Sequence, residues 1–179
     1  MVFDIYTLVE AIWLILPAFA ANGLAPLFRG KRPIDGGRML VKNRIFGPGK
    51  TWEGLMGGTI VAVAIALVQQ LAFPFLPWHI SEVPLSIAPM TAQLGFMLGL
   101  GAMAGDLGGS FIKRRFRMKR GAPAPLLDQL DFLTGAMLFA SLLVSIRTGW
   151  WILLLVITPV LHWIACIIGY LFKVKKTPY

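Results

Sequence analysis

The sequence predicts an all-α integral membrane protein that forms a single polytopic domain over residues 1–179, with about five transmembrane helices. Composition is the first observation behind this prediction: 57% of the residues are hydrophobic, 14% are charged and the mean hydropathy is +0.74. A water-soluble domain of this length could not cover its surface with so few polar residues. The second observation is that apolar runs of bilayer length recur along the whole chain, and the third is that the basic residues are confined to the segments between them.

Each predicted span has about 20 residues, enough to cross roughly 30 Å of hydrocarbon as a helix that rises about 1.5 Å per residue. The predicted spans are residues 5–28, 54–73, 91–112, 126–146 and 150–172. The first span has no basic stretch ahead of it and carries Glu10, Pro17 and Asn22. We therefore expect a retained helix rather than a cleaved signal peptide, with a kink at the proline.

The basic residues predict the topology. Seven Lys or Arg lie in residues 29–53, none in residues 73–90, six in residues 113–120 and three in the tail, while Arg147 is alone in its turn. Sixteen of the seventeen thus fall on one side, which places the N-terminus outside, the C-terminus in the cytoplasm and two basic loops on the cytoplasmic face of a multi-pass cell-membrane protein. Because topology explains the net charge of +9, we expect no nucleic-acid partner.

Isolated polar residues in the apolar spans and the outer loop do not predict a metal site. His79 lacks a partner at ligand spacing and is interpreted as a surface residue, and His162 as a buried hydrogen-bonding residue. Cys166 lies in an apolar run and is expected to pack rather than react. Glu10 lies near the outer end of the first span, so a packing or interfacial role is favoured over a catalytic one.

The first cytoplasmic loop ends in a glycine-rich segment, Asn43-Arg-Ile-Phe-Gly47-Pro-Gly-Lys50-Thr51-Trp-Glu53-Gly54, followed by Gly57 and Gly58. Lys50 and Thr51 at a helix start could hold a phosphate through charge and backbone N–H groups. The order Gly-x-Gly-Lys-Thr lacks the first glycine of a P-loop, and no preceding β-strand is expected. A glycine-rich turn with glycines for tight helix packing is an equally good local interpretation.

The second cytoplasmic loop favours a metal and phosphate site. Asp106, Ser110, Lys113 and Arg114 share one face of a helix that continues past the membrane surface, and the spacing of Asp128 and Asp131 points both carboxylates the same way from a first turn. An ionised carboxylate inside an apolar span costs roughly 3 kcal/mol or more unless it is paired or metal-bound. Carboxylates that bind Mg²⁺ beside basic residues that bind phosphates indicate phosphoryl or nucleotidyl chemistry at a membrane surface, in preference to a structural ion-pair network.

These residues carry a family resemblance. Ser110-Phe-Ile-Lys113-Arg114, then Lys119, then Asp128-Gln-Leu-Asp131 resembles a pattern of the membrane CTP:phosphatidate cytidylyltransferases. Lys50-Thr-Trp-Glu53-Gly54-Leu-Met-Gly57-Gly58 resembles a second motif of the same family. The chain departs from the bacterial pattern at Arg120, at Pro125-Leu-Leu127 and at Gln129, and it is shorter. With those departures, the whole chain is similar to the archaeal branch, the CDP-archaeol synthases.

The resemblance implies a reaction in which CTP and an isoprenoid ether-lipid phosphate, 2,3-bis-O-geranylgeranyl-sn-glycerol 1-phosphate, give CDP-archaeol and pyrophosphate with Mg²⁺. An anionic lipid phosphate needs alignment and charge cancellation rather than a general base. The roles that we expect are metal binding by Asp106, Asp128 and Asp131, and phosphate binding by Lys50, Thr51, Lys113, Arg114 and Lys119. Lys113 is also expected to be catalytic, and Asn43 and Glu53 are candidates for contacts to cytidine.

Three other functions remain open at this stage. A CDP-diacylglycerol synthase would run the same chemistry on phosphatidic acid. A small membrane transporter would use Glu10 and Asp106 to line a path, although the charges concentrate on one side. A prenyl-lipid kinase or phosphatase would differ in nucleotide use, and a kinase would release no pyrophosphate. The sequence assigns no oligomeric state.

Overall fold

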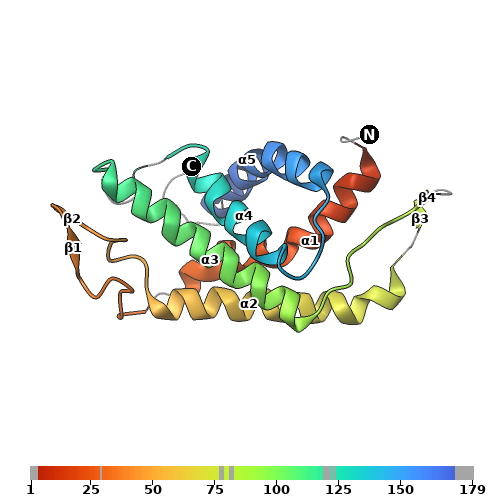
Figure 1. Cartoon of the computed structure of the whole chain (residues 1–179), viewed down its shortest axis with the longest axis horizontal. Coiled ribbons are helices and arrows are strands. Elements are labelled where there is room, and N and C mark those ends of the chain that lie inside the picture. The colour runs from red at the N-terminus through yellow and green to blue at the C-terminus, as the bar shows by residue number, and fades with distance from the viewer. Residues whose placement is uncertain are drawn as a thin grey trace.

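The protein folds as a bundle of helices that run alternately in opposite directions (Figure 1). Its structure, a computed structural model, describes residues 4–28, 30–76, 79–80, 83–118, 122 and 124–171. In this part of the chain the long helices are α1 (Ile5–Leu24), α2 (Trp52–Ala72), α3 (Ala92–Arg115), α4 (Leu127–Ala140) and α5 (Thr148–Leu171). Short 3₁₀ turns, η1 (Ala25–Phe28) and η2 (Phe73–Phe75), extend α1 and α2.

Three helices begin at side chains that accept the otherwise unpaired N–H groups of a first turn. Asp4 accepts a hydrogen bond from the Thr7 N–H ahead of α1, Thr51 caps α2 and Thr91 caps α3, each with an extended backbone. These caps explain why α2 begins directly after the Gly-rich segment of the first loop.

Small residues bring α4 very close to α3. A methyl group added at Gly101 would lie 2.4 Å from the carbonyl oxygen of Gly135, and one at Gly105 would lie 2.1 Å from that of Asp131. One helical turn further, a methyl group at Gly109 would lie 2.0 Å from a carboxylate oxygen of Asp131. The spacing of four residues puts these glycines on one face, so the α3–α4 contact is a small-residue interface that continues up to the acidic cluster.

Glycines also allow α2 to pack closely against its neighbours. A methyl group at Gly57 would collide with Phe28, and one at Gly58 would lie 2.6 Å from the sulfur of Met103 on α3. Gly95 and Gly99 of α3 pack equally closely on α2. Of the three motif glycines for which tight helix packing was predicted, Gly57 and Gly58 confirm it. At Gly54 an added methyl group would lie 3.2 Å from the Thr51 hydroxyl and 3.8 Å from the Ala25 carbonyl oxygen.

The buried core lies between α1, α3, α4 and α5, where Leu14, Leu98, Phe132 and Leu154 are fully or almost fully buried. Large apolar side chains also cover the outside, among them Ile60, Val68, Leu71, Phe75 and Val156. Within the described residues, three helices are long and apolar enough to cross a membrane, Ile5–Phe28, Trp52–Phe75 and Ala92–Arg115. An apolar exterior on helices of this length is that of a membrane protein.

The predicted fourth span, residues 126–146, is wrong at its C-terminal end. Helix α4 stops at Ala140 after 14 residues, about 21 Å of rise. The hydroxyl of Ser141 donates to the carbonyl of Leu138 at 2.6 Å, and the next N–H groups bond back to Phe139 and Ala140 in tight turns. This local side-chain bond competes with the helical ladder, and hydropathy alone does not register it.

Two short β-hairpins supplement the predicted all-α fold. Strands β1 (Met39–Leu40) and β2 (Asn43–Arg44) pair in the first cytoplasmic loop of the sequence prediction, and β3 (His79–Ile80) pairs with β4 (Val83–Pro84) in the segment between α2 and α3. The two hairpins lie at opposite ends of the bundle (Figure 1). Strand β2 thus precedes Gly47, the first glycine of the Gly-rich segment, contrary to expectation, but it is two residues long and pairs only within its hairpin.

At the end of the bundle where α1, α3 and α5 begin, Glu10 is a structural anchor. Its buried carboxylate accepts hydrogen bonds from the Ser86 N–H at 2.5 Å, the Trp150 indole at 3.1 Å and the Arg147 guanidinium at 3.2 Å. The predicted packing role of Glu10 is confirmed. Cys166 is buried as predicted, whereas the side chains of His79 and His162 lie outside the described residues.

Candidate functional site

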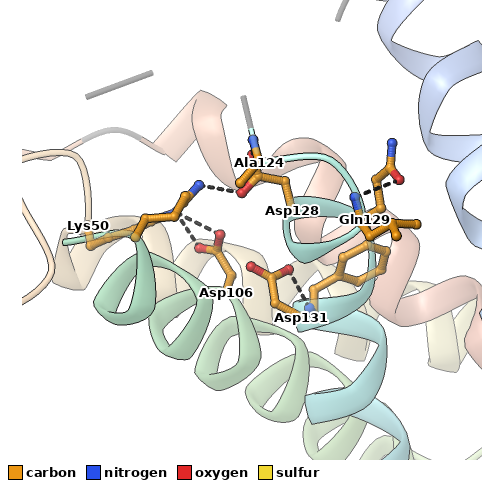
Figure 2. Close-up of polar contacts among 9 residues, drawn as sticks. Lys50, Asp106, Ala124, Asp128, Gln129 and Asp131 are labelled. Atoms are coloured by element: carbon orange, nitrogen blue, oxygen red, sulfur yellow. Dashed lines mark hydrogen bonds and ion pairs between the residues drawn. The ribbon is translucent and has the colours of Figure 1, made fainter. Parts of the chain in front are cut away.

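The opposite end of the bundle joins the two motifs through an ion pair. Lys50 directly precedes Thr51, the cap of α2. Its amine lies 2.7 and 2.5 Å from the two carboxylate oxygens of Asp106 on α3 (Figure 2). Both side chains are less than one-third exposed. The partner that an acidic residue within an apolar helix requires is therefore a lysine of the first loop, 56 residues away in the chain.

A second ion pair connects α3 to the start of α4. The amine of Lys113 donates to one carboxylate oxygen of Asp128, and the other oxygen accepts the Ala124 N–H at 3.0 Å. Lys113 and Asp106 lie two turns apart on the same helix face, as predicted. Asp106 and Asp128 thus each form an ion pair with a motif lysine.

Asp131 is placed differently. Its carboxylate lies against Gly109, and its hydrogen bond in the described structure comes from the N–H of Phe132 at 2.6 Å. Figure 2 shows the carboxylates of Asp106, Asp128 and Asp131 facing the space between α3 and the first turns of α4. The three predicted acidic residues therefore lie in the same region of the site. Among the described residues, lysines pair with Asp106 and Asp128, and no lysine or arginine forms an ion pair with Asp131.

A pocket of about 150 Å³ opens beside the two lysines. Its lining combines the glycine-rich turn with the C-terminal end of α3. It consists of Phe46, Gly47, Pro48, Gly49, Lys50, Ser110, Lys113 and Arg114. Drug-sized ligand sites occupy about 300–1,000 Å³, so this pocket suits a phosphate group better than a whole nucleotide. Three basic side chains in its lining give it the charge that a phosphate requires.

Asp35 holds the glycine-rich turn, and the sequence analysis missed it. Its side chain is fully buried and accepts hydrogen bonds from the Arg44 guanidinium and from the N–H groups of Gly37, Phe46 and Gly47. Burial acts to raise the pKa of Asp35, but these hydrogen bonds outweigh it and hold the pKa well below the usual range. The available signal was the sequence Asp35-Gly-Gly, which is typical of a turn closed by an aspartate side chain.

Arg115 fastens the β1–β2 hairpin to α3. Its guanidinium donates to the carbonyl oxygens of Leu40 and Arg44, both at 2.8 Å, and lies over the ring of Phe111 at 5.1 Å. The Phe111 ring also contacts Phe46 of the pocket lining, with centroids 6.4 Å apart. One of the six basic residues of the predicted second loop is therefore structural.

Three predicted contacts to phosphate or cytidine lie beside the pocket rather than in its lining. The Thr51 hydroxyl accepts the N–H groups of Gly54 at 3.2 Å and Gly30 at 3.4 Å, so it acts as the α2 cap. Glu53 pairs with Arg32 at 2.8 Å. Asn43 lies in β2, where its carbonyl faces Arg115 at 3.5 Å. Lys119 lies outside the described residues.

The carboxylates suit Mg²⁺ in chemical type, because Mg²⁺ prefers oxygen ligands and is commonly held by one or two carboxylates together with substrate phosphates. Within the part of the chain that the structure describes, no three His, Cys, Asp or Glu side chains are grouped closely enough to enclose a metal by themselves. In Figure 2 the carboxylate of Asp131 is on the side of Asp106, whose own carboxylate is turned toward Lys50. The donor set therefore fits a metal shared with a bound triphosphate.

Comparison with known proteins agrees with this geometry. The sequence profile of the family described as CarS-like, CDP-archaeol synthase, matches residues 3–179. The CDP-archaeol synthase of Pyrococcus abyssi is 44% identical over 95% of this chain and 97% of its own length, and that of Methanopyrus kandleri is 42% identical over 95% and 92%. The corresponding protein of Halobacterium salinarum is 39% identical over 97% of both chains.

A solved structure agrees as well. A protein described as an intramembrane enzyme for archaeal membrane lipids biosynthesis superposes with a TM-score of 0.75 and 37% identity, covering 89% of this chain and 94% of that one. The family resemblance of the two motifs is thereby confirmed along nearly the whole chain, and the helical bundle with its apolar exterior matches that of an intramembrane enzyme. The chain belongs to the CDP-archaeol synthase family.

Proposed function

We propose that the protein transfers the cytidylyl group of CTP to 2,3-bis-O-geranylgeranyl-sn-glycerol 1-phosphate, giving CDP-archaeol and pyrophosphate. Family membership supports the reaction class. The observation that carries the assignment to this site is the pocket in which Lys50, Lys113 and Arg114 line the space beside three carboxylates. An enzyme that joins two polyanions needs such concentrated positive charge.

The lipid phosphate supplies its own nucleophile. One of its oxygens forms a bond to the α-phosphorus of CTP while the bond from that phosphorus to the bridging oxygen of the β-phosphate breaks and pyrophosphate leaves. No proton has to be removed first, which fits a site whose described chemical groups are lysine, arginine, serine and aspartate. Lys50, Lys113 and Arg114 bind and orient the phosphate groups and offset their charge.

Mg²⁺ would be held by Asp106 and Asp131, with Asp128 as the third candidate ligand. When bound, the ion supplies positive charge to the triphosphate and the departing pyrophosphate. Lys50 and Lys113 already contact two of these carboxylates, so the same amines can hold the acidic residues and the substrate phosphates close together.

The site faces the cytoplasm in this proposal. The end of the bundle that carries it also carries the basic residues of the first loop and of α3, whereas Arg147 is at the other end. CTP arrives from water, and the two prenyl chains remain in the bilayer and enter between helices. The reaction therefore takes place at the inner membrane interface.

To test the proposal, purified protein in detergent is incubated with Mg²⁺, with either CTP or ATP, and with either the geranylgeranyl ether-lipid phosphate or phosphatidic acid. Mass spectrometry and a pyrophosphate assay should detect a CDP-lipid from CTP and the ether lipid. Faster product formation from phosphatidic acid would instead identify a CDP-diacylglycerol synthase. Absence of product from folded protein with both lipids would refute cytidylyl transfer.

A further inference from the structure

Asp35 is a buried, charged residue outside every helix, and the reaction outlined above assigns it no role. It precedes two glycines in the first loop, and its side chain is fully buried. A buried carboxylate is costly unless its oxygens are satisfied, and here Arg44 and three backbone N–H groups satisfy them. This concentration of bonds in a loop indicates that the loop needs a defined shape.

The bonds of Asp35 end at the wall of the phosphate pocket. One carboxylate oxygen accepts the N–H of Gly47 at 2.9 Å and that of Phe46 at 3.2 Å, and both residues line the pocket. Gly47 has φ of +99°, a conformation that side-chain-bearing residues rarely adopt. The acceptor thus lies at the position where the turn leaves ordinary backbone geometry.

The segment around Asp35 also holds the far end of the turn. The N–H of Ile34 donates to the carbonyl of Lys50 at 2.9 Å, and the N–H of Lys50 donates to the carbonyl of Gly47 at 3.3 Å. Residues 34–35 therefore contact both the first and the last residue of the turn 47–50. Lys50 in turn is the residue whose amine contacts Asp106.

We propose that Asp35 is a positioning residue for nucleotide binding: it fixes the turn 47–50 so that Lys50 and the turn backbone face the pocket and bind the CTP phosphates. The proposal rests on the function proposed above. Asp35 touches no substrate, and its effect passes through Gly47 and Lys50.

An asparagine at this position would meet only part of the requirement. A carboxylate is purely an acceptor and serves the Arg44 fork and three N–H groups at once, whereas an amide offers one acceptor oxygen and turns two donors toward the others. Asp35→Asn also leaves the charge of Arg44 unbalanced, which makes the loop more positive. Long-range electrostatics alone would then predict tighter binding of CTP, whereas loss of positioning predicts weaker binding.

Steady-state kinetics of Asp35→Asn separate these possibilities. The matched control is Asp4→Asn at the other end of the bundle, because asparagine caps a helix as well as aspartate does. We expect the KM for CTP to rise about tenfold, as expected for loss of hydrogen bonds to a charged group. The KM for the lipid should stay close to that of the control. The thermal midpoint should fall, because the buried carboxylate pairs with Arg44 and accepts three N–H groups that the amide cannot all serve. An unchanged or lowered KM for CTP, or an equal rise in both KM values, would overturn the proposal.

Limited trypsin digestion of the wild type and both variants in detergent tests positioning without any turnover. Cleavage after Arg44 and Lys50 should be faster in Asp35→Asn than in Asp4→Asn, and equal rates would contradict the proposal. If Asp35→Asn does not fold, Asp35→Glu retains the charge and the acceptors, and it should show a smaller rise confined to the KM for CTP. Wild-type protein that makes no CDP-lipid would refute the proposed function, while the digestion would still decide the role of Asp35.

Discussion

At the scale of single residues, the site combines acidic groups that have different partners. Asp106 and Asp128 pair with lysines, whereas Asp131 lies against Gly109 and has one described hydrogen bond, from the N–H of Phe132. A carboxylate held near two others without a basic partner contributes little to folding, because repulsion and burial oppose its charge. Its placement is better explained if Asp131 binds a cation or contacts a substrate, as proposed above.

Asp131→Asn should therefore separate activity from stability. The substitution keeps the shape and the acceptor for the Phe132 N–H but removes the charge, so we expect turnover to fall by at least about 100-fold, as for loss of an electrostatic catalytic group. The thermal midpoint should stay equal or rise. Product formation and thermal unfolding, measured beside Asp4→Asn, check both parts, and full activity would show that Asp131 has no part in the reaction.

The lowered pKa of Asp35 predicts a pH response of the first loop. Because the pKa is lower in the folded than in the unfolded state, the charged form contributes stability that is fully present above the ordinary aspartate value of about 3.9 and is lost as the pH falls through the folded-state pKa. Amide hydrogen exchange of Phe46 and Gly47, corrected for intrinsic rates, should therefore show constant protection from pH 7 to about 5 and decreasing protection below about 4. In Asp35→Asn the protection should be low throughout, and a wild-type profile without any decrease would contradict this account.

At the scale of elements, the contact between α3 and α4 determines how closely the acidic residues approach. Gly105 and Gly109 allow α4 to lie against α3 at Asp131, and Gly101 continues the contact toward the middle of the bundle. Gly108 is on the same helix, but nothing lies within 4 Å of a methyl group added there. The chain thus provides its own control for the effect of a methyl group at this interface.

Gly105→Ala should destabilise the protein by about 1–3 kcal/mol, as overpacking does, and should reduce activity because α4 is displaced. Gly108→Ala should be neutral or stabilising by up to about 1 kcal/mol, the gain in helix propensity. Thermal unfolding in detergent together with product formation distinguishes the two variants. Equal stability of Gly105→Ala and Gly108→Ala would show that the close contact is not needed.

At the scale of the whole molecule, the two ends of the bundle perform different tasks. At one end, Glu10 of α1 accepts hydrogen bonds from Ser86 in the segment between α2 and α3, from Arg147 in the turn before α5 and from Trp150 of α5. At the other end, the basic loop and the acidic residues form the site. The helices extend between these two ends, so the stabilising contacts of Glu10 lie apart from the proposed site (Figure 1).

The proposed orientation can be measured with single cysteines in a Cys166→Ala background. Lys42 and Ser145 are exposed and lie in loops at the two ends of the bundle. In sealed right-side-out vesicles, a membrane-impermeant maleimide should label Ser145→Cys directly and Lys42→Cys only after permeabilisation, as the positive-inside rule requires. The reverse pattern would place the site outside the cell.

The sequence predicted the helical membrane class, the meeting of the two motifs and, as one of two interpretations, the packing of Gly57 and Gly58, because hydropathy and helical spacing are local signals. It did not predict the glycine contacts between α3 and α4. It did not predict that Lys50 pairs with Asp106, that Asp35 supports Gly47 or that Arg115 holds the hairpin, since these contacts depend on how distant segments pack. The cap that Thr51 forms on α2 was not predicted, because a helix cap and a phosphate ligand require the same residue type at the same position. Its contact to phosphate stays a prediction. Nor did the sequence predict the early end of α4, where the Ser141 hydroxyl bonds back to the Leu138 carbonyl, because hydropathy does not register such local contacts.

We propose that the two motifs form a reaction site rather than a structural ion-pair network. Exchanging Lys50 and Asp106 tests this proposal most directly. The double variant Lys50→Asp with Asp106→Lys restores an ion pair between the same two positions. We predict that its thermal midpoint returns toward that of the wild type after each single variant has lowered it, while CDP-lipid formation from CTP and the ether lipid stays undetectable. Recovery of activity together with stability would contradict the account, because the pair would then serve the fold alone.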